Sequence, residues 1–230
     1  YFKDGINHHI VHHKNTVNPK KFGTKAAFVI DTELEGGETK TFDFRMSPHK
    51  MENAFFDFDE VFEVRKKESD EFYDEIQKDF NCEDEKNVQR QAFAGLLWNK
   101  QFYHYKVGKW LNGDPNFPVE RNFEHHVRNV EWKHMNCKDI ISMPDKWEYP
   151  WFATWYLAFH CVSFSILDPN FAKNQLQLLT KEWYMHPNGQ LPAYEWDFSD
   201  VNPPVHAWST FRVFKIDEKN NGKPDLAFLE

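Results

Sequence analysis

The chain has little cysteine: Cys82, Cys137 and Cys161 are the only three among its 230 residues. None of them forms a CxxC pair, and an odd, scattered set predicts neither a disulfide scaffold nor a zinc site. Sparse cysteine favours a reducing compartment. Because this piece also has no signal or transmembrane segment, we expect a cytoplasmic location. The first residue is Tyr1 rather than Met, so we expect the natural beginning of the chain to lie upstream.

Long apolar runs and an excess of positive charge are also absent. The longest apolar stretch, 151–167, is interrupted by His160, Ser163 and Ser165, and it falls short of the roughly 18 residues that a membrane helix requires. The formal net charge is -8, whereas phosphate binding requires clustered Lys and Arg. We therefore expect neither a membrane nor a nucleic-acid partner.

Aromatic residues are abundant, at 17% of the chain, with 23 Phe and 9 Trp. One interpretation is a core that is rich in aromatic side chains. The other is that some rings form stacking platforms in a pocket for an uncharged ligand. A sugar suits the second interpretation, since a pyranose ring has an apolar face and a polar rim.

The first fifty residues show strand patterns. Residues 24–33 and 38–46 are two runs of strand type, and Gly36-Gly37 between them favours a hairpin turn. The histidine-rich stretch 8–13 favours an earlier strand, on which each face would carry two histidines and an incomplete metal-ligand set. We therefore predict neither a metal nor a cofactor. Because two or three strands cannot bury both faces, we assign 1–50 to a remnant of a larger sheet.

Helical patterns follow. An exposed helix is predicted within 51–82, with Asp57 and Glu60 as a possible capping box. A second helix is predicted from about 85 to 110, with its apolar side chains facing inward. These inward residues are Val88, Ala92, Phe93, Leu96, Leu97 and Phe102. A turn at 112–118 and a long loop at 121–149 come next.

The last third carries clear helix boundaries. Residues 151–167 are apolar nearly all round and predict a buried helix. Asp168-Pro169 is a cap-plus-proline start, and the helix it opens should end before Asn188-Gly189. Asn202-Pro203 repeats that start. Its helix should bury Val205, Trp208, Phe211 and Phe214, and Asp225 should open one further turn.

The segment 188–208 carries the densest chemistry. Gln190 and Asn202 can each donate and accept hydrogen bonds, which suits hydroxyl recognition. Tyr194 and Trp196 offer rings for stacking, and Glu195 offers an acid–base group or a hydroxyl acceptor. Asp197 and Asp200 lie close by, and unscreened like charges repel. The alternative is structural: Asp200 and Asn202 serve as turn and cap residues, His160 and His206 as satisfied structural histidines, and Trp196, Phe198 and Trp208 as core.

The stretch from 143–152 to 205–208 closely resembles the glucosidases and mannosylglycerate hydrolase-like enzymes of glycoside hydrolase family 63. The block Asn-Gly-Gln-Leu-Pro-Ala-Tyr-Glu-Trp at 188–196 carries the most specific likeness. Residues 87–98 also resemble the first barrel helix of large members. The resemblance is weakest before Asp57 and between Pro115 and Asn129.

This resemblance implies a mainly α fold. In it, 83–230 form the N-terminal part of an (α/α)6 toroid, preceded by strands of a β-sandwich and a linker helix. It also implies hydrolysis of an α-glucoside or small α-glycoside with inversion, by two carboxylic acids spaced to admit a water between them. Both family carboxylates should lie beyond Glu230, so no catalytic residue is predicted here. The partners would be an oligosaccharide or small glycoside and the rest of the parent chain. The implied substrate-binding residues are Trp155, Tyr156, Phe159, Gln190, Tyr194, Glu195, Trp196 and Asn202.

One position departs from the family pattern, in which Trp is followed by Asp. Here Tyr156 follows Trp155, and a neutral phenol cannot accept two hydroxyl protons as a carboxylate does. The runner-up hypothesis is therefore a non-catalytic carbohydrate-binding pseudoenzyme. A third is a helical scaffold with an aromatic core and no ligand.

Overall fold

The computed structural model describes residues 4–113 and 127–230 and is mostly helical. It divides into two compact units, 1–59 and 60–230, which are described separately. Within the described residues, no helix combines the length and apolarity needed to cross a membrane. The predicted turn at 112–118 and part of the predicted loop at 121–149 lie outside the described residues.

The described part of the first unit begins with helix α1 (Asp4–His12), where a strand was predicted at 8–13. The His8 and His12 rings lie one helical turn apart, with centroids separated by 5.7 Å. The Thr16 hydroxyl donates to the carbonyl oxygen of Gly5 at 2.7 Å. A Cβ at position 5 would stand 2.6 Å from the Thr16 carbonyl oxygen, so this close approach requires glycine.

The predicted hairpin forms its turn but not its strands. The Glu38 N–H donates to the Glu35 carbonyl at 3.0 Å, and Gly37 has a φ of 84°. The Phe28 and Phe44 rings approach across the turn to 6.2 Å, yet neither arm of the described segment 24–46 is a strand. Phe28 is 90% and Met46 99% exposed. An isolated two-stranded hairpin is marginal in water without an apolar surface to cover, so the strand prediction is wrong here.

The second unit begins with two helices, α2 (Phe58–Ile76) and α3 (Glu83–Trp98). The start of α2 matches the prediction, although the carboxylate of Asp57 accepts a hydrogen bond from Arg45. Arg90 on α3 pairs with Asp70 on α2 at 2.7 Å. Phe93, Leu96 and Leu97 pack on the core as predicted, whereas Val88 is exposed.

The predicted helix 85–110 is wrong beyond Trp98. The chain passes instead into strand β1 (Lys100–Lys106) and the short helix α4 (Val107–Asn112). β1 pairs antiparallel with β2 (Asn136–Ser142), a strand within the predicted loop. Phe102, which was assigned inward, is exposed because side chains alternate along β1 and Tyr103 faces the core.

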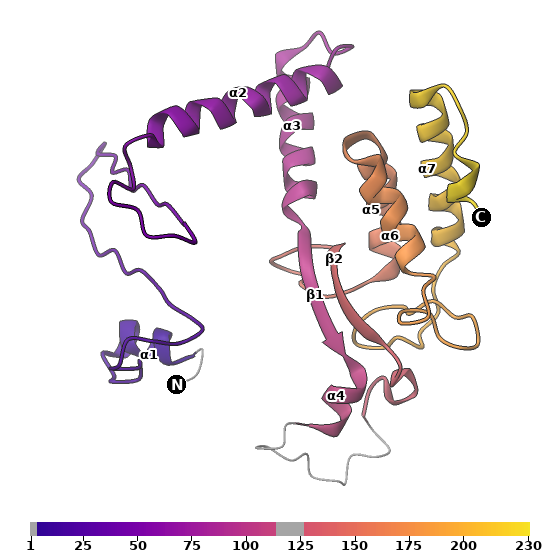
Figure 1. Ribbon diagram of the computed structural model, residues 1–230, viewed down its shortest axis with the longest axis horizontal. Helices are drawn as coiled ribbons and strands as arrows, with labels where there is room; N and C mark the ends of the chain where they lie inside the picture. The colour runs from indigo at the N-terminus through magenta and orange to yellow at the C-terminus, as the bar shows by residue number, and fades with distance from the viewer. Residues whose placement is uncertain (1–3, 114–126) are drawn as a thin grey trace. The chain divides into compact units, whose positions relative to one another are not determined.

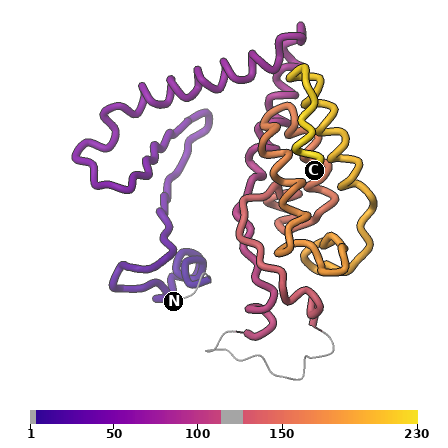
Figure 2. Tube along the Cα trace, turned by 45° about the vertical axis from the view of Figure 1, so that its right-hand side comes forward, coloured from indigo at the N-terminus to yellow at the C-terminus, as the bar shows by residue number. Residues whose placement is uncertain are grey.

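A three-helix layer packs beside this two-stranded sheet (Figure 1). It comprises α5 (Thr154–Leu167), α6 (Pro169–Leu178) and α7 (Val205–Asn221), and α6 and α7 both contact α5. The view along the Cα trace shows the same grouping (Figure 2). Two short 3-10 helices complete the elements of the described residues, η2 (Val130–Trp132) and η3 (Leu226–Phe228). The core lies between the sheet and the three helices, and its largest fully buried side chains include Trp132, Phe152, Phe164, Tyr184 and Phe198.

The helix boundaries after residue 150 follow their predicted chemistry in part. Asp168 caps α6 by accepting the Phe171 N–H at 3.0 Å, and Gly189 has the left-handed φ of 89°. However, α6 ends at Leu178, so Trp183 lies in a following turn. Asp225 opens a single 3-10 turn, as expected for a short final element.

Two burial predictions in this layer are wrong. On α5, Tyr156, Phe159 and Ile166 form an exposed stripe, although the rest of the helix is largely buried. On α7, Trp208 and Phe211 are about half exposed. Side chains three and four residues apart share one helix face, and the described residues leave this face of each helix uncovered.

Candidate functional site

Backbone hydrogen bonds bring the two sequence motifs together. The Thr154 N–H, at the start of α5, donates to the Ala193 carbonyl at 2.9 Å. The Glu195 N–H donates to the Phe152 carbonyl at 3.0 Å, and Ala153 and Tyr194 form an antiparallel bridge. Segments that lie some forty residues apart are therefore joined in the way that neighbouring strands are joined.

The segment between α6 and α7 folds back on itself. At its narrow end, the Ala193 N–H donates to the Phe198 carbonyl at 2.9 Å. At its open end, Gln190 Nε2 donates to the Ser199 carbonyl at 3.0 Å. Asn202 Nδ2 donates to the Leu191 carbonyl at 3.0 Å. These contacts give the segment a fixed shape without regular secondary structure. We call 190–202 the pocket loop.

A cavity of about 440 Å³ lies between the pocket loop and the starts of α5 and α7. Three of the predicted site residues line it: Trp155, Gln190 and Asn202. The other lining residues are Thr154, Leu191, Val201, Pro203, Pro204, His206 and Ala207. This volume falls within the range of small-molecule sites, and the mostly apolar wall with a few polar groups is typical of them.

Apart from Trp155, the predicted aromatic residues do not line the cavity. The Tyr194 ring packs on Trp155 with centroids 5.6 Å apart, so it supports the wall from behind. Tyr156 lies on the exposed face of α5, 6.3 Å from the Tyr149 ring. Phe159 packs against Trp208 on that exposed face, at 5.7 Å.

Trp196 is 45% exposed, and its ring contacts a charged side chain rather than the cavity wall. The Arg128 guanidinium lies over its ring at 4.1 Å, a cation–π geometry. The Trp151 ring meets it edge-on at 5.8 Å. Trp196 is therefore a surface aromatic held from two sides, and not a core residue.

The three neighbouring carboxylates each accept a different backbone N–H. Glu195 Oε2 accepts the Phe152 N–H at 3.4 Å. Asp197 accepts the Ser199 N–H at 3.0 Å, and Asp200 accepts the Val201 N–H at 2.7 Å. Asp197 and Asp200 thus each stabilise a local turn, which is the structural alternative considered for Asp200, whereas Glu195 bonds to the segment before α5. None of the three lines the cavity.

The Glu195 carboxylate also affects the pKa of Tyr103, a buried residue of β1. Burial raises the pKa of Tyr103, and the nearby Glu195 carboxylate raises it further. The Tyr103 hydroxyl is therefore neutral across the physiological range, and it has no hydrogen-bond partner among the described residues.

Sequence reasoning missed the residue that clamps the pocket loop, Asn129. Its Nδ2 donates to the Glu195 carbonyl at 2.7 Å, and its Oδ1 accepts the Phe198 N–H at 2.9 Å. Asn129 is buried and has a left-handed φ of 61°. It lies in a stretch of weak periodicity, and the only local indication was that Asn tolerates this backbone conformation better than other non-glycine residues.

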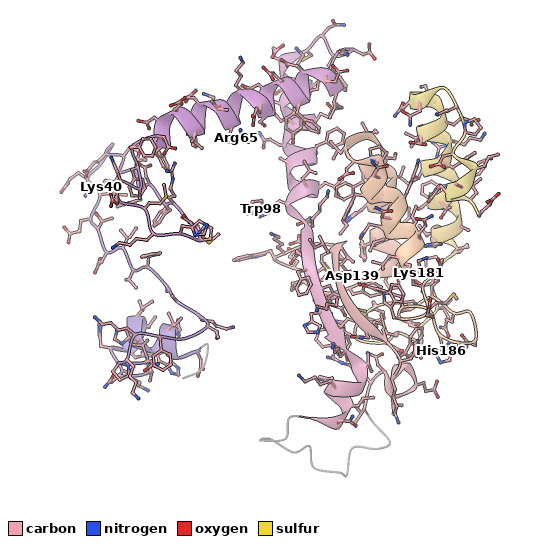
Figure 3. All side chains as sticks on the ribbon, in the orientation of Figure 1. Lys40, Arg65, Trp98, Asp139, Lys181 and His186 are labelled. Carbon is pink, nitrogen blue, oxygen red and sulfur yellow. The ribbon has the colours of Figure 1, made fainter. Side chains whose placement is uncertain are left out.

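A second contact supports the same loop. Trp132 Nε1 donates to the Ser199 hydroxyl at 2.8 Å, and the Trp132 ring packs 5.0 Å from His186. Figure 3 labels His186 in the segment that follows α6 and Asp139 on β2. Because Trp132 is fully buried, it anchors the pocket loop to the core.

The two histidines considered earlier are both partnered. His206 lines the cavity, and its Nε2 lies 2.9 Å from the Leu176 carbonyl. His160 Nδ1 lies 2.7 Å from the Ser142 hydroxyl. Burial lowers the pKa of both imidazoles, so both are neutral near pH 7. Among the residues described, no three His, Cys, Asp or Glu side chains gather closely enough to hold a metal ion.

Comparison with known proteins gives one informative match. The uncharacterized protein YMR196W of Saccharomyces cerevisiae (strain ATCC 204508 / S288c) is 46% identical to the chain over 244 aligned residues. The match covers 100% of this chain and 22% of the yeast protein, so the chain spans less than a quarter of that relative's length. No protein-family model matches the chain, and no solved structure matches it.

Proposed function

We propose that the chain is the sugar-binding part of an α-glycosidase similar to glycoside hydrolase family 63. The observation that carries this proposal is the cavity where Trp155, Gln190 and Asn202 converge from α5 and the two ends of the pocket loop. An indole ring beside neutral amides suits a sugar, because the ring covers the apolar face while the amides meet hydroxyl groups.

The proposal includes the architecture and chemistry of the longer protein. The helices α3, α5, α6 and α7 would belong to an (α/α)6 toroid, and the carboxylic acids that invert the anomeric centre would come from other parts of that protein. Two observations support this division of labour. Glu195, Asp197 and Asp200 each accept a backbone N–H of the chain itself, and the yeast relative extends far beyond the matched region.

The test is direct binding of methyl α-D-glucoside to the chain, measured by ligand-observed NMR. We expect saturable binding that Trp155→Leu weakens by about fivefold or more, since stacking on an aromatic ring contributes roughly 1 kcal/mol or more. Trp98→Leu is the matched control, because Trp98 is 73% exposed and does not line the cavity. Equal weakening by both substitutions, or no binding at all, would reject the site.

A pseudoenzyme remains the second candidate, because Tyr156 stands where the family pattern has Asp. Tyr156 is 39% exposed and does not line the cavity. The experiment that separates the candidates is Tyr156→Asp in the longer protein, with hydrolysis of an α-glucoside as the readout. A gain in hydrolysis supports a lost carboxylate function, and an unchanged rate removes Tyr156 as the cause of any defect.

A further inference from the structure

The polar side chains of the cavity donate hydrogen bonds to backbone carbonyl oxygens of the protein. Gln190 Nε2 faces two carbonyl oxygens, that of Ser199 at 3.0 Å and that of Asp200 at 3.5 Å. A carbonyl oxygen can only accept, so the amide nitrogen must occupy this position and the orientation of the amide is fixed. The atom that remains for a ligand is the acceptor Gln190 Oε1.

Asn202 repeats this arrangement on the other side of the pocket loop. Its Nδ2 donates to the Leu191 carbonyl at 3.0 Å, and this contact fixes Oδ1 as the second amide atom. Oδ1 is shielded from solvent and has no hydrogen-bond partner among the described residues. An unpaired buried acceptor is unfavourable. A ligand group that donates a hydrogen to it would remove that penalty, once Asn202 shifts slightly toward the cavity.

Thr154 and His206 follow the same rule. The Thr154 hydroxyl donates to the Pro192 carbonyl. His206 Nε2 meets the Leu176 carbonyl at 2.9 Å, so this nitrogen carries the hydrogen and the neutral ring keeps Nδ1 as an acceptor. Three of these four side chains therefore have only acceptor capacity left, whereas Asn202 Nδ2 keeps a second amide hydrogen beside the unpaired Oδ1.

Besides the second amide hydrogen of Asn202, donors at the cavity come from the backbone. The start of α7 carries Pro203 and Pro204, which have no N–H, and the Val205 N–H is taken by the Pro203 carbonyl at 2.7 Å. The next N–H groups, of His206 and Ala207, have no partner within the helix because they belong to its first turn. A ligand group that both donates and accepts fits such a site better than one that only accepts.

We infer that this cavity recognises its ligand through the ligand's own hydroxyl hydrogens, which Gln190 Oε1 and Asn202 Oδ1 accept. This inference rests on the proposed function and deepens it, because it states which property of the sugar is recognised. Carboxylate, phosphate and ether groups have no hydrogen to donate, so they leave Gln190 Oε1 and Asn202 Oδ1 unpaired. A fluorinated sugar, in which fluorine replaces a hydroxyl of similar size, is discriminated against for the same reason.

The experiment compares methyl α-D-glucoside with the series of its analogues in which one hydroxyl at a time is replaced by fluorine. Binding to the unmodified chain is measured by ligand-observed NMR, so no variant has to fold. We expect at least one analogue to bind about tenfold more weakly, the loss that corresponds to one hydrogen bond. Equal binding of the glucoside and every analogue would overturn the inference and leave the proposed function standing. Absence of saturable glucoside binding would overturn both.

A variant then assigns the acceptor. Gln190→Met keeps the length of the side chain and removes Oε1, so it should weaken the glucoside and abolish the discrimination against one fluorinated position. Gln91→Met is the matched control, since Gln91 is exposed on α3 and bonds only to Asn87 at 3.1 Å. If Gln190→Met keeps the full discrimination at every position, Gln190 Oε1 is not an acceptor for the ligand and that part of the inference is wrong.

Discussion

Asn129 provides the sharpest test of how the pocket loop is held. Its side chain joins the Glu195 carbonyl and the Phe198 N–H, at 2.7 and 2.9 Å, and these groups lie on opposite sides of the narrow end of the loop. Asn129→Gly removes both hydrogen bonds while allowing the φ of 61°. Asn129→Ala removes the same bonds and adds the steric conflict of a Cβ in a left-handed conformation.

The expected magnitude follows from these contacts. Leaving a buried donor or acceptor without a partner costs about 1–3 kcal/mol, so Asn129→Gly should lower the free energy of unfolding by about 2–4 kcal/mol. The left-handed conformation costs an alanine about 1–2 kcal/mol, and the lower chain entropy of unfolded alanine offsets up to about 1 kcal/mol of this. Asn129→Ala should therefore be destabilising by a similar or slightly larger amount.

The assay is urea unfolding followed by tryptophan fluorescence. All nine tryptophans lie in the unit formed by 60–230, so the signal reports the unfolding of the unit that contains the loop. A lower midpoint with an unchanged slope indicates lost stability rather than a changed unfolded state. Methyl α-D-glucoside binding is measured in parallel, because loosening the loop should also separate Gln190 from Asn202.

Asn87→Ala is the control, since Asn87 is exposed on α3 and its side chain accepts only from Gln91. It should change the free energy of unfolding by about 0.5 kcal/mol or less. If Asn129→Gly is as mild as Asn87→Ala, the two hydrogen bonds do not hold the loop and the clamp is refuted. A large difference between Asn129→Gly and Asn129→Ala would instead identify backbone conformation as the main contribution.

Three further predictions concern buried charge and pH. Lys173 forms an ion pair at 2.7 Å with Asp217, whose side chain is 5% exposed. In urea titrations, Lys173→Met should lower the free energy of unfolding by about 3 kcal/mol, and adding Asp217→Asn should restore part of that loss. An unchanged free energy of unfolding in Lys173→Met would show that the pair is dispensable. Burial alone would raise the pKa of Asp168, but Lys100 and the helix N–H lower it below its ordinary value. That stabilisation is present above about pH 4 and is lost as the pH falls through the depressed pKa. Lys100→Met should therefore move the acid-unfolding midpoint, measured by circular dichroism, to higher pH. An unmoved midpoint would contradict the pairing of Lys100 with Asp168. Burial lowers the pKa of His160, so below about pH 6.5 the unfolded chain binds a proton that the folded chain does not. The free energy of unfolding should therefore rise from about pH 5 to 7, and His160→Gln should flatten that rise. An identical pH profile in the variant would remove His160 as the source of the rise.

Local sequence chemistry predicted the elements whose causes are local. The Asp168 cap, the turn at Gly36-Gly37 and the left-handed turn at Gly189 all appear where their residue types place them. The buried helix α5 was also predicted, to within a few residues at its start. In each case the determining interaction joins residues no more than about four positions apart, so the sequence contains it directly.

Predictions failed where a distant partner decides the outcome. The segment 100–106 has an apolar pattern that continues the α3 helix, yet it pairs with 136–142 as a strand. The segment 24–46 has the alternation of a strand but lacks a surface to cover within the described residues, so its strands do not form. Asn202 has the composition of a helix cap, but its side chain bonds to Leu191 and closes the pocket loop.

The sequence by itself determined that the chain is rich in helix, because helix patterns and caps are local. It also proposed eight substrate-binding residues, from residue type and from the family resemblance, and Trp155, Gln190 and Asn202 are three of them. Only the tertiary structure decided that these three share a cavity while Tyr156 and Phe159 lie on an exposed helix face. It also decided that the Glu195 carboxylate accepts the Phe152 N–H and that Asn129 clamps the loop. The physical reason is that these arrangements depend on hydrogen bonds between segments some 40 to 70 positions apart, about which local pattern carries no information.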